Sequence, residues 1–179
     1  GYIFGTEEYA GGISINQVYS SSYGCDVDYV IPGHLSKVTT DATQLGYGAF
    51  HNCTMLQTIE CNSVTTAKEY AFRGCTALTE LSMNAIDGTI PTGMLMGCTA
   101  IKEFTVPSAV HAISDSAFSG CSSLLRLNSS EDGHFELFDE ITTIGSSVFN
   151  GCSKMKSIHL PFIGASADAT GKEVAFGDS

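Results

Sequence analysis

The sequence predicts a solenoid, a fold in which similar coils stack along one axis, and three observations support this prediction. A five-residue pattern, Ala-Phe-x-Gly-Cys, occurs at residues 71–75 and 117–121, with variants that end at Cys53, Cys98 and Cys152. Successive pattern cysteines are 22, 23, 23 and 31 residues apart. Apolar and polar residues alternate at a fixed distance after each of them. Such coils bury their apolar sides only by stacking on their neighbours.

A period in the twenties is typical of leucine-rich-repeat solenoids, in which each repeat contributes one short strand. Positions six and eight after each cysteine are mostly apolar, while position seven is polar, as in Ile59-Glu60-Cys61. This alternation predicts a half-buried strand. The inward positions hold Ile59, Leu81, Phe104, Leu127 and Ile158 in one column and Cys61, Met83, Val106, Ser129 and Leu160 in the other.

A second inward column lies eight residues before each cysteine and predicts a short second strand per repeat: Leu45, Ala67, Ile90, Ile113 and Ile144. The pattern between this column and the cysteine is too short for a stable helix, so we expect a 3₁₀ or single helical turn there. The residue before each cysteine is glycine, or asparagine at Asn52, which predicts a left-handed backbone. Pro107 and Pro161 are expected to end strands.

Three regions follow from the repeat register. Residues 1–28 are rich in Gly, Ser and Tyr and do not follow the repeat, so they are expected to form a cap or spacer over the first coil. An alternative for these residues is a tyrosine contact surface for a glycan or protein. Residues 29–161 carry the repeats, and residues 162–179 are expected to be a C-terminal cap or linker. Because the chain opens at Gly1, we expect it to be a piece of a longer protein.

The last full repeat contains eight additional residues between Leu127 and Ile141. Insertions in solenoids usually form loops on one face, often a binding face. We therefore expect a loop whose candidate contact residues are Glu131, Asp132, Phe135 and Phe138. Its acidic residues lack the order of an EF-hand, which disfavours calcium. In the alternative interpretation the segment is solvated and the two phenylalanines pack on the solenoid.

Composition narrows the classes of partner and cofactor. Nineteen acidic and eight basic residues give a net charge of −11, which disfavours nucleic acids and anionic membranes. Five of the seven cysteines share one column and Cys61 fills an apolar position, so we expect free buried thiols rather than disulfides. The sequence contains no CxxC pair that would suggest zinc or redox chemistry, and no cofactor is predicted. No apolar run reaches membrane-spanning length.

The repeat resembles the BspA-type leucine-rich repeat, most clearly at Ala117-Phe118-Ser119-Gly120-Cys121-Ser122-Ser123-Leu124, and the resemblance covers about residues 29–161. Residues 1–6, 19–22 and 162–166 look like spacers between repeat blocks of large bacterial surface proteins. The resemblance implies a cell-surface or secreted protein that adheres to a host extracellular-matrix protein, a cell-surface protein or a glycan. It implies no catalytic residues.

Two functions from different classes remain, together with a weaker enzymatic alternative. The first is a binding module that uses the outward strand residues Thr58, Glu60, Glu80, Ser82, Glu103, Thr105, Arg126, Asn128, Ser157 and His159. The second is a structural spacer in a tandem surface protein, since these outward positions include no aromatic residue. Glu80 and Glu103 occupy one column and are expected about 5 Å apart on adjacent strands, a spacing that also suits a retaining glycosidase.

Overall fold

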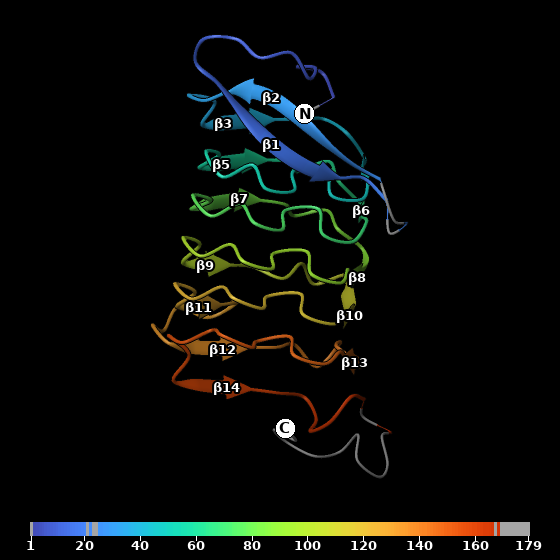
Figure 1. Ribbon diagram of the computed structural model, residues 1–179. Coiled ribbons are helices and arrows are strands. Elements are labelled where there is room, and N and C mark those ends of the chain that lie inside the picture. The colour runs from blue at the N-terminus through green and yellow to red at the C-terminus, as the bar shows by residue number, and fades with distance from the viewer. Residues whose placement is uncertain (1, 21, 23–24, 167, 169–179) are drawn as a thin grey trace.

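The protein is a β-solenoid, as the repeat predicts (Figure 1). The computed structural model describes residues 2–20, 22, 25–166 and 168. Its coils stack along one axis, and a two-stranded hairpin lies across the end of the stack that holds the first coil. The residues that the structure describes contain strands and turns but no helix.

Each coil contributes one strand to a parallel array on one side of the stack, which we call the first ladder. The hydrogen-bonded pairing of its strands is interrupted at one point, which divides the ladder into two sheets. The strands β3, β5 and β7 form one sheet, and β9, β11, β12 and β14 form another. These strands span Lys37–Thr39 (β3), Thr58–Glu60 (β5), Glu80–Ser82 (β7), Glu103–Phe104 (β9), Arg126–Leu127 (β11), His134–Glu136 (β12) and Ser157–His159 (β14).

The predicted second strand of each repeat is confirmed and forms a second parallel ladder. It pairs β4 with β6 in one sheet, and β8, β10 and β13 in another. The strands are short: Gln44–Leu45 (β4), Thr66–Ala67 (β6), Gly88–Ile90 (β8), Val110–Ile113 (β10) and Thr143–Ile144 (β13). The core runs along the axis between the two ladders, where the inward columns of successive coils are buried against one another.

The segment that ends at each cysteine is a series of turns, so the expected 3₁₀ or helical element is wrong. The residue before each cysteine is left-handed as predicted, with φ values of 58° at Asn52 and 75–77° at the glycines. The residue five positions before each cysteine is left-handed too: Gly48, Tyr70, Gly93, Ser116 and Ser147. A left-handed residue at both ends stops a helix from propagating, because helices need a run of right-handed residues. Glycine, tyrosine and serine all occur at this position, so no residue type in the sequence indicated its left-handed backbone.

These turns stack into a third array, the turn ladder, which is continuous through all five copies. The Phe72 N–H donates to the Met94 carbonyl (3.0 Å), and the same bond recurs from Phe118 to Val148 (3.0 Å). The cysteines after the first coil add a second link, because the thiols of Cys75, Cys98, Cys121 and Cys152 each donate to the carbonyl of the Phe or Leu in the preceding coil. The Cys98 thiol, for example, lies 3.1 Å from the Phe72 oxygen. Cysteine therefore suits this column because it is small, apolar and still able to donate.

The thiols are free, as predicted, and six of the seven are buried. Burial raises the pKa of Cys53, Cys61 and Cys152 to about 11 and raises that of Cys75 well above its usual value. Since thiolates are the reactive form, we expect Ellman's reagent to label about one of the seven cysteines in the folded protein, Cys25. The rest should react only after unfolding in urea. Rapid labelling of several thiols without urea would contradict this burial.

The eight additional residues form a strand of the first ladder rather than the expected loop. Strand β12 inserts between β11 and β14, pairing Leu127 with Phe135 and Phe135 with Ile158. The second ladder contains no matching strand, because β13 pairs directly with β10. The insertion therefore adds one strand, or about 4.8 Å, to the first ladder without a counterpart in the second. The alternation His134-Phe135-Glu136-Leu137, with Phe135 and Leu137 buried, was the sequence signal for this strand.

The N-terminal hairpin caps the first coil. It pairs β1 (Gly12–Val18) with β2 (Asp26–Pro32) antiparallel. In the turn ladder, the residue before a cysteine donates its N–H to the next coil, so the His51 carbonyl of the first coil has no backbone donor among the described residues. The buried Gln17 side chain supplies one, with its Nε2 3.1 Å from the His51 oxygen and 3.3 Å from the Cys53 sulfur. Because β2 crosses the expected boundary at residue 28, we propose that the cap extends to Pro32.

His51 makes the docking of this cap sensitive to pH. Its Nδ1 accepts the Val18 N–H at 3.3 Å, and burial, helped by the charge of Arg73, lowers its pKa. The His51 imidazole therefore takes up a proton at a higher pH in the unfolded chain than in the folded protein. The free energy of unfolding consequently falls once the pH drops below about 6.5.

We expect urea titrations to show a loss of stability as the pH falls through about 6.5. The loss should be smaller in His51→Gln, whose amide oxygen can still accept the Val18 N–H. The exposed His111 provides the control variant His111→Gln, which should retain the full loss. Equal pH dependence in both variants would exclude His51 as the cause.

Candidate functional site

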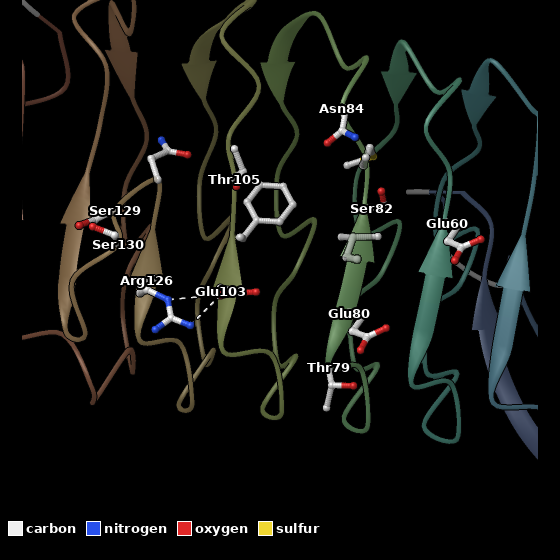
Figure 2. A pocket seen from close by; sticks show the side chains of 14 residues that line it. Glu60, Thr79, Glu80, Ser82, Asn84, Glu103, Thr105, Arg126, Ser129 and Ser130 are labelled. Atoms are coloured by element: carbon white, nitrogen blue, oxygen red, sulfur yellow. Dashed lines mark hydrogen bonds and ion pairs between the residues drawn. The ribbon is translucent and has the colours of Figure 1, made fainter.

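The outward side chains of the first ladder, which we call the strand face, contain the predicted binding residues. Strand pairing places Thr58, Glu80, Ser82 and their neighbours in rows along β3, β5 and β7, and the rows resume on β9. Most of these side chains are exposed or half-buried. Figure 2 shows Glu60, Glu80 and Ser82 on neighbouring strands of the first sheet, with Glu103 and Thr105 across from them.

The strand face is interrupted between β7 and β9. Among the described residues, β7 pairs only with β5, and β9 pairs only with β11. A groove of about 560 Å³ lies at this interruption and extends along the strand face. Its lining comes from both sheets and from the segment after β11, and includes Glu80, Ser82, Asn84, Glu103, Thr105 and Ser130. The sequence contained no signal for the interruption, because the 23-residue period continues across it.

Carboxylates give the groove a negative wall on the β7 side. Glu60 binds Lys37 (2.6 Å) and Thr39 (3.0 Å), and these hydrogen bonds lower the pKa of its carboxyl group. Glu80 accepts only a hydrogen bond from Thr58, at 3.2 Å. Glu80 therefore has no cationic partner among the described residues and remains available to a positively charged ligand.

On the other wall of the groove, Arg126 pairs with two carboxylates. Its guanidinium contacts Glu103 (2.8 Å) and Asp132, and the hydrogen bond to Glu103 raises the pKa of Arg126. The pair joins β9 to β11 across the exposed surface (Figure 2). Exposed pairs of this kind stabilise a fold little. Since Glu60 is paired with Lys37 and Glu103 with Arg126, Glu80 is the carboxylate of the groove lining that has no cationic partner among the described residues.

Other predicted binding residues are engaged within the fold. Asn128 has a left-handed backbone (φ 59°), accepts the Val106 N–H (2.7 Å) and donates to the Glu136 carbonyl (3.0 Å). It therefore joins neighbouring coils. Ser157 lies 2.6 Å from His134 Nδ1, and His159 lies 4.0 Å from Glu136, so both contribute to exposed side-chain pairs on β12 and β14.

The insertion residues divide into exposed and buried ones. Glu131 and Asp132 are exposed, and Asp132 binds Arg126 beside the groove. Phe135 is completely buried and packs edge-on against Phe149, with ring centroids 5.5 Å apart. It cannot contact a partner, so its assignment as a binding residue is wrong and the packing alternative applies. Phe138 is half-buried.

The strand pairing expected between Glu80 and Glu103 is absent from the described residues. Glu80 and Glu103 lie on β7 and β9, which belong to different sheets, so the expectation of hydrogen-bonded neighbouring strands is wrong. Arg126, rather than Glu80, is the close partner of Glu103. The part of the chain that the structure describes also brings together no three His, Cys, Asp or Glu side chains that could hold a metal ion. It contains no helix long and apolar enough to cross a bilayer.

A second hollow, of about 480 Å³, lies where the cap meets the first coil. It is lined by Tyr2, Tyr19, Tyr29 and Tyr47, together with the Gln17 segment. The side chains of Tyr2 and Tyr19 are largely exposed, and Tyr9, which does not line the hollow, is exposed too. A tyrosine contact surface stays a prediction. Tyr23, the remaining tyrosine of the predicted cluster, lies outside the described residues.

Two comparisons bear on the family. The family model for the BspA type leucine-rich repeat region matches six copies, at residues 34–134 and 128–167. A leucine rich cell surface protein from Faecalibacterium prausnitzii is similar in structure, with a TM-score of 0.52 and 25% identity. The match covers 72% of this chain but only 30% of that one.

A leucine-rich repeat protein from Bacteroides ovatus matches more weakly, with a TM-score of 0.43 and 16% identity over 87% of this chain and 53% of that one. No curated protein matches the chain. The match of the family model, which spans most of the sequence, agrees with the ladders, turns and cysteine column described above. The chain belongs to the family of proteins with BspA-type leucine-rich repeats.

Proposed function

We propose that the chain is a non-catalytic binding module of a bacterial cell-surface or secreted protein, and that it mediates adhesion through its strand face. The observation that supports this most directly is the groove at the interruption between β7 and β9. It lies on an exposed, polar face of a scaffold whose coils are joined by three ladders. The similar protein from F. prausnitzii is a cell surface protein, which supports this location.

The proposed ligand is a host extracellular-matrix or cell-surface protein or a glycan. Polar side chains at fixed spacing can recognise such ligands, because the scaffold orders them before binding and so lowers the entropic cost of association. The net charge of −11 and the free Glu80 carboxylate favour a ligand with basic groups.

This proposal can be tested by measuring the affinity of the purified chain for a panel of matrix proteins, mucins and glycans. We expect saturable binding to at least one of them and a loss of affinity of about tenfold in Glu80→Lys/Glu103→Lys, because two charges of the groove are reversed. Asp139→Lys/Glu140→Lys is the control, since it makes the same change in net charge at exposed positions outside the groove. Circular dichroism should confirm that both variants fold. Equal affinity of the two variants would exclude the groove.

A structural spacer is the second candidate function. It is favoured by the absence of exposed aromatic side chains from the outward positions of the described first ladder. Aromatic residues are enriched at the centres of protein interfaces. If no member of the panel binds, the spacer is the better account.

A further inference from the structure

We propose that the groove takes up an extended basic peptide segment, which adds to the unpaired edge of β7 as an additional strand. This inference rests on the proposed binding function and specifies the ligand and the mode of recognition. Strand addition requires free backbone groups at an accessible sheet edge. The interruption of the first ladder supplies two such edges, one on each side of the groove.

The hydrogen bonds of β7 identify its free groups. The Ser82 carbonyl accepts the N–H of Cys61 (2.8 Å), so the backbone of Ser82 points toward β5. Backbone groups of successive residues in a strand point to opposite sides. Leu81 therefore directs both its N–H and its carbonyl toward β9, with which β7 does not pair.

The facing edge of β9 is free for the same reason. The Phe104 carbonyl accepts the N–H of Asn128 (3.2 Å), so the backbone of Phe104 points toward β11. Glu103 and Thr105 consequently direct their backbone groups toward β7. Elsewhere in the first ladder neighbouring strands satisfy such groups, as between β3 and β5 or β12 and β14. Between β7 and β9 the groove takes the place of a neighbour.

Charge selects the kind of peptide. The carboxylate of Glu80, which has no cationic partner among the described residues, lies on the β7 wall, while Glu60, one strand away, is paired with Lys37 (Figure 2). In an extended peptide, alternate side chains point to the same face. A segment with Lys or Arg at alternate positions would therefore direct its cations at this wall while its backbone pairs with Leu81. Acidic or neutral segments would gain only the backbone bonds.

The test uses an acetylated, amidated nine-residue peptide in which Lys or Arg alternates with Thr or Val, and measures its affinity by fluorescence anisotropy. A second peptide of the same sequence is N-methylated at alternate residues, which removes the donors along one edge and leaves the charges unchanged. We expect N-methylation to weaken binding about tenfold or more, because several backbone hydrogen bonds are lost. Glu80→Lys should weaken binding about fivefold relative to Glu140→Lys, because the cations lose their free carboxylate.

Hydrogen exchange gives an independent measure of backbone pairing. The amides of Leu81 and Thr105 should exchange rapidly in the free protein and more slowly with the unmethylated peptide. The amide of Asn128, which already donates to Phe104, should be unchanged.

The outcomes separate this inference from the function on which it rests. Equal binding of the two peptides, or no protection of Leu81, would overturn strand addition and leave binding by charge alone. If no peptide binds while a glycan or folded protein does, strand addition is overturned and the proposed binding function stands. If nothing binds, both are overturned.

Discussion

Replacing Phe118 with alanine is expected to lower the free energy of unfolding by about 3–5 kcal/mol. The Phe118 side chain is completely buried in the axis of the solenoid. Its ring lies 5.6 Å from that of Phe104 and stacks on that of Phe149 at 5.7 Å. Alanine would leave a cavity among three coils, and the turn ladder on either side, whose backbone bonds remain, limits how far the coils can close it.

Urea denaturation followed by circular dichroism measures this loss. Phe4→Ala is the control, because Phe4 is 38% exposed and lies in the N-terminal segment before β1. Its free energy of unfolding should change by no more than about 0.5 kcal/mol. If Phe118→Ala unfolds at the same urea concentration as the original protein, the column of phenylalanines does not form the core.

Replacing Gly48 with alanine is expected to lower the free energy of unfolding by about 3 kcal/mol and to detach the N-terminal cap. Gly48 has a φ of 57°, and a β-carbon added there would lie 1.9 Å from the Val18 carbonyl oxygen. The strain of a left-handed alanine adds to this overlap, which only a shift of β1 can relieve. Such a shift would also break the contacts of Gln17 and Val18 with His51.

Gly46→Ala is the matched control, because the added β-carbon meets no atom within 4 Å and the backbone is not left-handed. It should be neutral or slightly stabilising. Hydrogen exchange should show loss of protection along β1 and β2 in Gly48→Ala alone. Full protection of the hairpin in Gly48→Ala would mean that the cap docks elsewhere.

The Ala-Phe-x-Gly-Cys pattern predicted the features that depend on one repeat and its copies. Gly74 and Gly120 are left-handed, Cys98 is a free buried thiol, and Leu127 and Ile90 are buried. Each of these follows from the local conformation or the size of a side chain, repeated at a fixed interval. For this reason, the fold class could be predicted before any contact between coils was known.

The candidate site could be predicted only as a row of outward residues. Glu80 and Ser82 are correctly assigned to one exposed strand, because side chains alternate along it. The groove beside them depends on whether β7 pairs with β9, and the residues of the two strands do not encode this locally. The engagement of Asn128 with Val106 and Glu136 also depends on the distance between coils.

By itself, the sequence determined the coil: its period, its inward columns, its left-handed turn and its buried cysteines. These features result from forces between residues close in the chain and from copies that stack in register. Only the tertiary structure decided how individual coils meet. It placed Phe135 in an additional strand, Gln17 on the open end of the turn ladder and a groove between β7 and β9. Most contacts between coils join residues more than twenty positions apart, and small differences in packing decide whether their backbones pair or separate.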